Sequence, residues 1–425
     1  MMTMLLISLA FILVIGAPIA VGLGLSSAAA LYFFLDIPLV VVPQTMFKAV
    51  DSFSFLAVPF FILAGSFMTR GGVTKRIIDF AMSLVGHIAG GIAQVVVLSG
   101  MFFASMSGSS AATTAAIGAS MVDEMSKRGY PRSFAAAVVA SGGTVGIVIP
   151  PSLTMVIYGA TANVSIADLF MGGFAPGILM GLSMMAVNYY ISRKNKYSGE
   201  GAFSLKQVGK SLGDCIWALM VPVIVLGGIY GGVFTPTEAA AVAAMYAVFV
   251  GAFIYKELTW AALPKVLLDS AIATSMVMFV VGGANLLGWI LTSARVAHKL
   301  AADIAVFTDS PVVFLVLVNL LLLALGCVIN ASAAVVIVTP LLLPVAVSLG
   351  IDPTFFGVLM VVNLAIGCIT PPVGVDLFIA STISRVSLDE VVVKVLPYLG
   401  ALLMVLAIVT YFPNIILFLP NFING

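Results

Sequence analysis

The chain has 425 residues, of which 62% are hydrophobic and only 8% are charged, whereas soluble domains carry about 25% charged residues. Its 18 basic and 17 acidic residues nearly cancel. They lie in short segments between long apolar stretches, which excludes a basic face for nucleic acid. The composition is typical of a protein that spans a lipid bilayer. The sequence contains no GxxxxGK[ST] loop, so it does not predict ATP hydrolysis by a P-loop.

The N-terminal half predicts five membrane passes, because a span needs about 20 apolar residues. The first apolar stretch has no basic segment before it and continues into further spans, so we expect it to be retained rather than cleaved as a signal peptide. A basic segment from Arg193 to Lys210 follows the fifth pass and is predicted to be cytoplasmic. The predicted passes cover residues 4–21, 22–38, 53–69, 133–160 and 168–192.

The C-terminal half predicts five more passes, at residues 213–232, 237–255, 268–290, 355–381 and 394–418. An odd number of passes in each half makes the second half enter the membrane from the opposite side, as in the inverted repeats of secondary transporters. We therefore divide the chain into a first repeat (1–195), a cytoplasmic loop (196–212) and a second repeat (213–425).

Each half also contains one charge-free stretch, 80–122 and 310–351, that predicts a re-entrant helical hairpin. In the first stretch the segment SMSGSS interrupts the helix and leaves two arms of about a dozen residues each. An α-helix of that length spans ~18 Å, which is too short to cross about 30 Å of hydrocarbon. The flanking charges predict that the first hairpin opens to the cytoplasm and the second to the outside. These charges are Arg70, Lys75, Arg76, Lys127, Arg128 and Arg132 for the first hairpin, and Arg295, Lys299, Asp303, Asp309 and Asp352 for the second.

A shift of 221 positions superposes the residues that bend or break helices in the two halves. A double proline at the same depth in both halves is difficult to obtain by chance. The superposed pairs are Gly129 with Gly350, Gly146 with Gly367, Pro150–Pro151 with Pro371–Pro372, Thr161 with Thr382, and Ser109 with Asn330.

The double prolines predict two broken helices, because proline lacks a backbone donor and clashes with the preceding turn. Carbonyl groups freed in this way are tolerated at membrane depth where they line a cavity, and there they can bind a small cation. Glycine, serine and proline also occur in membrane helices for close packing and kinks, but two matching copies favour binding. We predict two sodium sites, each between a hairpin tip and a break, formed by Ser107, Ser109, Ser110, Gly146, Ile149 and Pro151, and by Gly326, Ile329, Asn330, Gly367, Thr370 and Pro372.

Helix N-termini at the tips and breaks carry partial positive charge and predict an anionic solute. Asp376 is an acid inside a predicted span, which indicates function, although it could equally cap the helix that restarts there. Glu238, in the segment TPTE, predicts a capping box instead. The three cysteines fall in apolar sequence and predict buried packing residues. The candidate substrate ligands are Ser110, Thr113, Ser152, Thr154, Asn330, Ser332 and Asp376.

With these motifs, the chain resembles the large membrane subunit of tripartite ATP-independent periplasmic (TRAP) transporters, of the DctM or SiaM type, over nearly its whole length. The residues that carry the resemblance are DSFSFLAVPFFILAG (51–65), SMSGSSAATTAAIG (105–118), GGTVGIVIPPS (142–152), GGIYGGVFTPTEAAAV (227–242) and GCITPPVGVDLF (367–378).

The resemblance implies a multi-pass protein of the bacterial cell inner membrane that imports organic acids, typically sialic acid or C4-dicarboxylates. It implies coupling to two or more sodium ions and an elevator motion of the domain that holds both hairpins. It also implies two partners, a small four-helix membrane subunit and a soluble periplasmic substrate-binding protein. Some family members fuse the small subunit to the N-terminus; this sequence shows no such extension, so we expect a separate subunit that binds the first few spans.

Two alternatives remain open. A sodium–dicarboxylate carrier that works alone is also similar in having paired hairpins and broken helices. A channel or an intramembrane enzyme is disfavoured, because the sequence shows neither a ring-forming selectivity motif nor a serine, a histidine and a carboxylate within the spans. The expected fold is therefore an all-α integral membrane protein, an inverted-repeat transporter with two re-entrant hairpins and two broken helices.

Overall fold

The computed structural model describes residues 4–5, 7–8, 11–12, 15–34, 37–199, 201–293 and 310–424. Throughout these residues the regular structure is helical, which confirms the all-α prediction. Seven of the described helices are long and apolar enough to cross a membrane. The flanking charges Arg295, Lys299, Asp303 and Asp309 lie outside the described residues.

In the N-terminal half, five residues of the first predicted pass (4–21) lie outside the described part of the chain. The described helices follow the other four predicted passes with two differences. The second pass begins at Ile19, directly after Pro18, and an additional short helix precedes the third pass. The helices are α2 (Ile19–Phe34), α3 (Val41–Val50), the 3₁₀ turn η1 (Phe53–Leu56), α4 (Ala57–Arg70), α5 (Val73–Val85), α6 (Gly91–Ser107), α7 (Ser110–Lys127), α8 (Arg132–Gly143), η2 (Thr144–Ile147), α9 (Leu153–Ala162) and α10 (Ile166–Asn195).

The C-terminal half differs from prediction at its end, where the expected last pass is two helices. They separate at Phe412, because Pro413 disfavours helical geometry in the residue before it. The helices are α11 (Leu205–Tyr230), α12 (Pro236–Phe249), the π-helical turn η3 (Val250–Ile254), α13 (Leu263–Ser293), α15 (Pro311–Gly326), α16 (Ala331–Ser348), α17 (Pro353–Gly367), α18 (Val375–Ser384), α19 (Leu388–Tyr411) and α20 (Asn414–Asn424).

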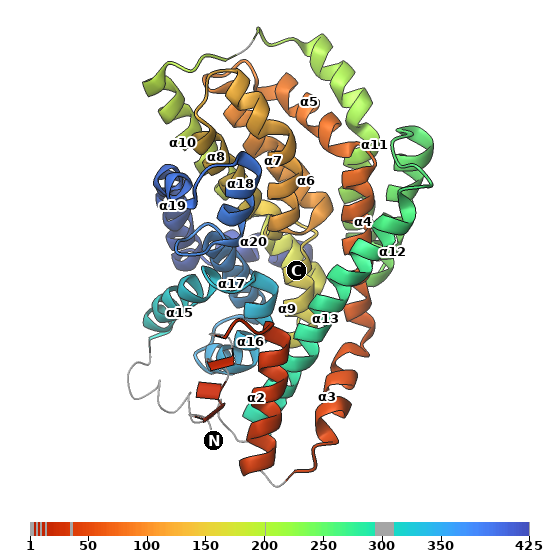
Figure 1. Cartoon of the computed structure of the whole chain (residues 1–425), viewed down its shortest axis with the longest axis vertical. Coiled ribbons are helices and arrows are strands. Elements are labelled where there is room, and N and C mark those ends of the chain that lie inside the picture. Colours follow the sequence, from red (N-terminus) through yellow and green to blue (C-terminus); the bar gives the residue numbers. More distant parts are fainter. Residues whose placement is uncertain are drawn as a thin grey trace.

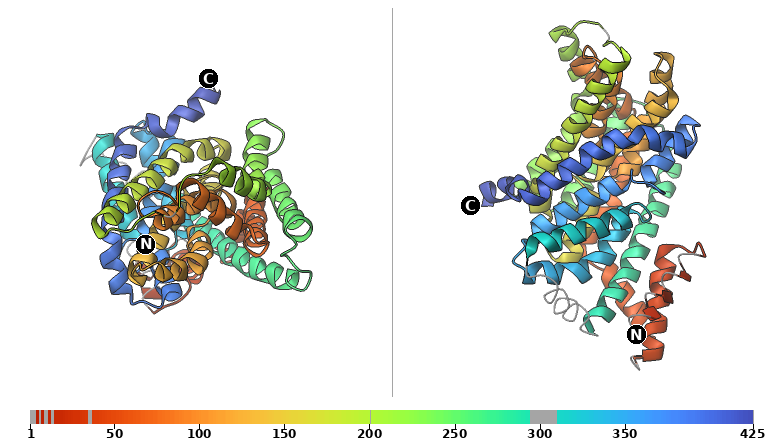
Figure 2. Two further views of the ribbon diagram at one scale, coloured as in Figure 1. Left: turned by 90° about the horizontal axis from the view of Figure 1, so that it is seen from above. Right: turned by 90° about the vertical axis from the view of Figure 1, so that its left-hand side faces the viewer.

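The helices form two groups that lie side by side (Figure 1). The first group contains α2, α3, α4, α11, α12 and α13, with α12 packed along α4 and α13 packed against α2 and α3. The second group contains the hairpins α6–α7 and α15–α16, the broken helices α8–α9 and α17–α18, and the helices that support them. The C-terminal helix α20 packs against α10, and the C-terminus projects from the side of the molecule (Figure 2).

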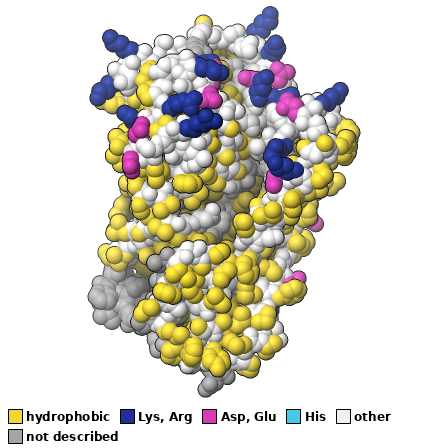
Figure 3. All heavy atoms as spheres, viewed as in Figure 1, with side chains coloured by type: hydrophobic (Ala, Val, Ile, Leu, Met, Phe, Trp, Pro, Cys, Tyr) yellow, Lys and Arg dark blue, Asp and Glu magenta, His cyan; other side chains and the backbone are white. Residues whose placement is uncertain are grey.

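The hairpins occupy opposite halves of the molecule. The α6–α7 hairpin lies in the upper half of Figure 1 and the α15–α16 hairpin in the lower half. On the face shown in Figure 3, lysine and arginine gather at the upper end. Basic residues collect on the cytoplasmic side of membrane proteins, so the gathered charges agree with the predicted orientation. The two hairpins lie toward opposite ends of the molecule.

The internal repeat appears in the helix boundaries as well as in the sequence. Helix α16 reproduces both ends of α7 at the shift of 221 positions, and α17 begins where the shift of α8 places it. The glycines that end the hairpins, Gly129 and Gly350, both have positive φ angles, 84° and 76°. The two halves therefore share one backbone path through the hairpin and the break.

Candidate functional site

A cavity of about 290 Å³ lies where the two hairpin tips meet. One wall comes from α4 and α13 of the first helix group, and the opposite wall comes from the tips and breaks of the second group. The lining residues carry no charged side chain. They include Ser66, Thr69, Ser107, Gly108, Ser109, Ser110, Ile147, Leu153, Thr154, Ala273, Val277, Asn330, Ala331, Ser332, Cys368 and Val375.

The first hairpin tip contacts the first break through its backbone. Gly108 ends α6 with a left-handed φ of 60°, and Ser109 caps α7 by accepting a hydrogen bond from the Ala112 N–H group at 3.4 Å. The Leu153 N–H group donates to the Gly108 carbonyl at 3.2 Å. A Cβ atom at Gly146 would lie 2.6 Å from the Ser109 carbonyl oxygen, so only glycine permits this approach.

The second tip contacts the second break in the same way. The Gly374 N–H group donates to the Cys327 carbonyl at 2.9 Å, and a Cβ atom at Gly367 would lie 2.6 Å from the Gly326 Cα atom. Asn330 caps α16, with its side-chain oxygen accepting from the Ser332 N–H group at 2.9 Å. The prediction that each break faces the tip of its own half is confirmed.

The double prolines interrupt the helical hydrogen bonds as predicted, and both contain a cis peptide bond. Because Pro151 has no N–H group, the Ile147 carbonyl accepts a hydrogen bond from the Ser152 hydroxyl instead. Because Pro372 has none, the Cys368 carbonyl accepts from the Asp376 N–H group at 3.0 Å. Carbonyl oxygens thus lie at both breaks, with the Ser152 hydroxyl at the first. Neutral oxygens of this kind can bind a small monovalent cation such as sodium.

The residues predicted to bind cations divide into two sets by position. Ser107, Ser109, Ser110 and Asn330 line the cavity. The others do not line it and belong to the helix ends and broken segments that adjoin the tips: Gly146, Ile149, Pro151, Gly326, Ile329, Gly367, Thr370 and Pro372.

The residues predicted to bind substrate also divide. Ser110, Thr154, Asn330 and Ser332 line the cavity, and the hydroxyls of Thr154 and Ser332, which come from opposite halves, are 3.5 Å apart. The other three predicted ligands, Thr113, Ser152 and Asp376, are buried behind the cavity wall.

Two of those buried side chains have structural partners. The Thr113 hydroxyl donates to the Ser109 carbonyl at 2.8 Å, and the Ser152 side chain caps α9 by accepting from the Met155 N–H group at 3.2 Å. Asp376 does not cap α18, because the cap residue is Gly374 and no side-chain hydrogen bond is formed there. Of the two roles considered for Asp376, helix capping is therefore wrong.

Four helices begin at the wall of the cavity. Their first residues are Ser110 of α7, Leu153 of α9, Ala331 of α16 and Val375 of α18, and all four residues line it. Each helix N-terminus presents unpaired N–H groups and partial positive charge. The cavity is therefore suited to an anion, although no lining side chain is basic.

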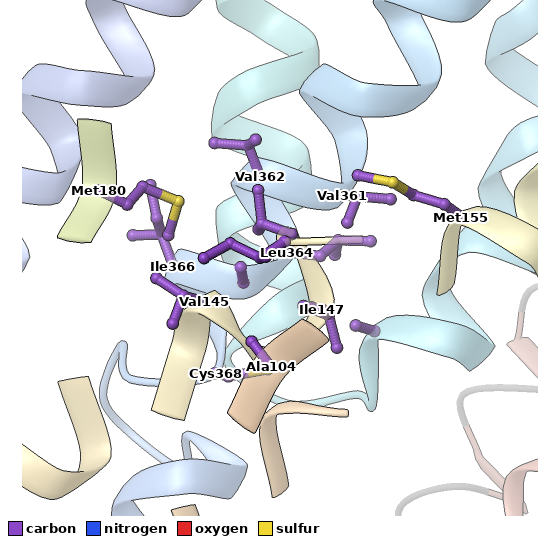
Figure 4. Close-up of a cluster of buried hydrophobic side chains, with 14 of the residues drawn as sticks. Ala104, Val145, Ile147, Met155, Met180, Val361, Val362, Leu364, Ile366 and Cys368 are labelled. Atoms are coloured by element: carbon purple, nitrogen blue, oxygen red, sulfur yellow. The ribbon is translucent and has the colours of Figure 1, made fainter. Parts of the chain in front are cut away.

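Apolar packing holds the breaks in place. Figure 4 shows Val361, Leu364 and Ile366 of α17 packed against Val145 and Ile147 of the first break, with Met155 and Met180 beside them. All these side chains are buried. Because such interiors are close-packed, this packing fixes the first broken segment against α17 and α10.

The family of the DctM component of tripartite ATP-independent periplasmic transporters matches residues 6–415. The chain belongs to this family. It is 44% identical over 403 residues to the C4-dicarboxylate TRAP transporter large permease protein DctM of Pseudomonas aeruginosa, covering 95% of this chain and 94% of that protein. The predicted resemblance is confirmed.

Other TRAP relatives carry different substrate names. The 2,3-diketo-L-gulonate large permease protein YiaN of Escherichia coli is 41% identical, with 96% of both chains covered. The isethionate permease protein DctMQ of Oleidesulfovibrio alaskensis is 44% identical, and this chain spans 96% of its own length but 65% of that protein. These relatives are named permeases, so the prediction of a transporter rather than an enzyme is confirmed.

The fold has a counterpart among solved structures. The crystal structure of the Alcanivorax borkumensis YdaH transporter superposes with a TM-score of 0.59 at 17% identity, covering 88% of this chain and 89% of that one. At this identity the likeness concerns the fold alone. It supports the helical architecture described above.

The sequence of this TRAP permease did not reveal Ser66 and Thr69, which α4 contributes to the cavity. The Thr69 hydroxyl donates to the Gly65 carbonyl within the same helix at 2.8 Å, an ordinary arrangement for threonine in a membrane helix. A signal was available in Gly65, where an added Cβ atom would lie 3.3 Å from the Ser107 Cα atom, because glycine permits such close helix contact.

The capping box predicted at Glu238 is present. The Thr235 side chain accepts from the Glu238 N–H group, and the Glu238 carboxylate accepts from the Thr235 N–H group at 2.8 Å. All three cysteines are buried and free, as predicted.

Proposed function

We propose that this TRAP permease is a sodium-coupled importer of an organic acid anion, of the sialic acid or C4-dicarboxylate class. In this proposal it works by an elevator motion and receives its substrate from a periplasmic binding protein. A small four-helix membrane subunit completes the transporter.

The observation that carries the proposal is the convergence of four helix N-termini on an uncharged cavity. Helix N-termini bind carboxylates through backbone N–H groups and the helix dipole. The hydroxyls of Ser110, Thr154 and Ser332 and the amide of Asn330 supply additional hydrogen bonds to the solute. The cavity volume, about 290 Å³, is near the lower end of the range of about 300–1,000 Å³ for ligand pockets, which suits a small acid.

Sodium coupling is supported by the two tip–break contacts. Each brings the unwound segment of a broken helix against the tip of a hairpin, and unwound segments of this kind coordinate cations in secondary transporters. Bound sodium would supply positive charge beside the four helix N-termini. The anion and the cations would then stabilise the same arrangement of the tips.

The elevator motion is supported by the position of the cavity. Its walls belong to two different helix groups, with α4 and α13 on one side and the hairpin tips on the other. A solute held by the tips could therefore move with the second group past the first. Small-subunit binding is assigned to the exposed apolar side chains of α2, α3 and η1, including Tyr32, Phe33, Phe47 and Phe53.

The test is uptake into vesicles that contain the permease and its small subunit, with labelled acids and candidate binding proteins added in turn. We expect uptake with a sodium gradient and a matching binding protein, and no uptake when the gradient is collapsed. Depletion of ATP at constant gradient should have no effect. Uptake that follows ATP instead of sodium would contradict the coupling.

Two substitutions connect this test to the site. Ser109→Leu and Asn330→Leu place a bulky apolar side chain at each tip and should abolish uptake while membrane insertion stays normal. Normal uptake by both variants would contradict the proposed sites. If the permease transports without a binding protein, the alternative of a carrier that works alone would hold; the family match favours the tripartite system.

A further inference from the structure

Asp376 is a buried acid with no hydrogen-bond partner for its side chain. It lies in the first turn of α18 with 0% of its surface exposed, and neither carboxylate oxygen accepts a hydrogen bond within the described part of the chain. An ionised carboxylate in this state is strongly unfavourable unless a positive charge accompanies it. No described lysine or arginine forms an ion pair with it.

Two hydroxyl groups lie beside this carboxylate. Helix α18 packs against α7, which brings Ser110 and Thr114 next to Asp376. Apart from the neighbouring carboxylate, the buried Thr114 hydroxyl has no hydrogen-bond partner among the described residues, and the Ser110 hydroxyl donates to the Cys368 sulfur at 3.8 Å. The oxygens of all three side chains therefore lie together and could contact a cation.

The other half of the molecule contains the same helix crossing without these groups. At the shift of 221 positions Asp376 corresponds to Met155, Ser110 to Ala331 and Thr114 to Val335. Helix α9 packs against α16 as α18 packs against α7, and these three side chains are all buried. Since an apolar set fills this crossing in one half, the fold does not require the polar set in the other.

We propose that Asp376 and Thr114, together with Ser110, form a further sodium site. It shares Ser110 with the first tip–break site but differs from both tip–break sites because it has a charged ligand. The site rests on the proposed sodium coupling. It joins the first hairpin, through α7, to the second broken helix, through α18, so its occupancy links the two halves. Asp376 then serves the cation and not the substrate, since its negative charge would repel an organic acid.

The experiment measures the thermal unfolding midpoint of the purified full-length chain as sodium chloride replaces choline chloride at constant ionic strength. A ligand that binds the folded state raises the midpoint with the logarithm of its concentration once that concentration exceeds the Kd. We expect Asp376→Asn to raise the sodium concentration at which the midpoint begins to rise about tenfold or more, and Thr114→Val to raise it less. The matched control is Asp389→Asn, which removes an exposed carboxylate from the next helix and should leave the response unchanged.

The sodium-free midpoint gives a second readout. Asp376→Asn removes an unpaired buried charge, so in choline its midpoint should equal or exceed that of the unmodified protein. A structural role alone would lower it, which would overturn the proposal.

Three other outcomes also decide against this site. If Asp376→Asn and Thr114→Val keep the full sodium response, this site is absent while the two tip–break sites stand. If Asp376→Asn changes only the pH dependence of the midpoint, the group carries a proton and the proposal fails. If the unmodified protein does not respond to sodium, both this proposal and the proposed coupling fail.

Discussion

The two broken segments follow the same backbone path but differ in exposure. In the first, Pro150, Pro151 and Ser152 are all buried. In the second, Pro372 is exposed and Val373, at the position equivalent to Ser152, has 43% of its surface exposed. The first break is thus closed within the protein, whereas the second is open at its surface.

The chemistry of the two restarting helices differs as well. Ser152 caps α9 and also donates to the Ile147 carbonyl, so that one side chain satisfies both sides of the first break. Helix α18 begins one position later than the repeat predicts, after Gly374, whose φ angle of 53° suits glycine. The inverted repeat therefore preserves the backbone geometry of the two breaks. Differences in side chains leave the first break buried and the second accessible.

The largest expected effect comes from filling the contact between the first tip and its break. In Gly146→Ala the added Cβ atom would lie 2.6 Å from the Ser109 carbonyl oxygen and 2.7 Å from the Thr113 hydroxyl. Overpacking costs about 1–3 kcal/mol, and here backbone must move. We expect uptake to fall roughly tenfold or more, since each ~1.4 kcal/mol corresponds to a factor of about ten.

The matched control is Gly400→Ala in α19, where an added Cβ atom has no neighbour within 4 Å. It should transport normally. If Gly146→Ala transports as well as this control, the close approach of tip and break is not needed for function.

The next effect separates the closed break from the open one by thiol reactivity. Ser152→Cys and Val373→Cys place a cysteine at equivalent positions, and a buried thiol is inert whereas an accessible one reacts. In the purified protein a water-soluble maleimide should modify Val373→Cys roughly tenfold faster or more. The unmodified protein gives the background, since its three cysteines are buried. Equal modification rates would contradict the difference in exposure between the two breaks.

The fold was largely predictable because its helices break and turn at residues that restrict the backbone strongly. The double prolines predicted both breaks, and SMSGSS predicted a tip that the structure places at Gly108 and Ser109. The short helix α3 was missed, because Pro43 falls in its first turn, where proline is compatible with a helix, and no long apolar stretch marks it.

The site was predictable only in part, since side-chain direction depends on packing. The tip residues Ser109 and Asn330 line the cavity as their position in the chain suggests. Ser152 and Asp376 were expected there too, but both are buried and neither lines the cavity. Ser66 contacts the cavity only because α4 packs against the hairpin, and that long-range contact leaves no local pattern.

A smaller effect tests the cap that closes the first break. Ser152→Ala removes the N-cap of α9 and leaves the buried Ile147 carbonyl without its donor. Loss of an N-cap costs about 1 kcal/mol, so the thermal unfolding midpoint of the purified permease should fall. The equivalent change in the second half, Val373→Ala, alters an exposed side chain and should shift the midpoint much less. Equal shifts would mean that the cap contributes nothing.

The smallest expected effect comes from giving the second break the serine of the first. Val373→Ser should change stability by no more than about 0.5 kcal/mol, because α18 is capped at Gly374 and the new hydroxyl would stand one residue too early. The cap position cannot accept serine either, since a Cβ atom at Gly374 would lie 2.9 Å from the Cys368 carbonyl oxygen. If Val373→Ser raised the unfolding midpoint as much as Ser152→Ala lowers it, α18 would begin as α9 does. The exposure of the second break would then be caused by one side chain and not by its backbone conformation.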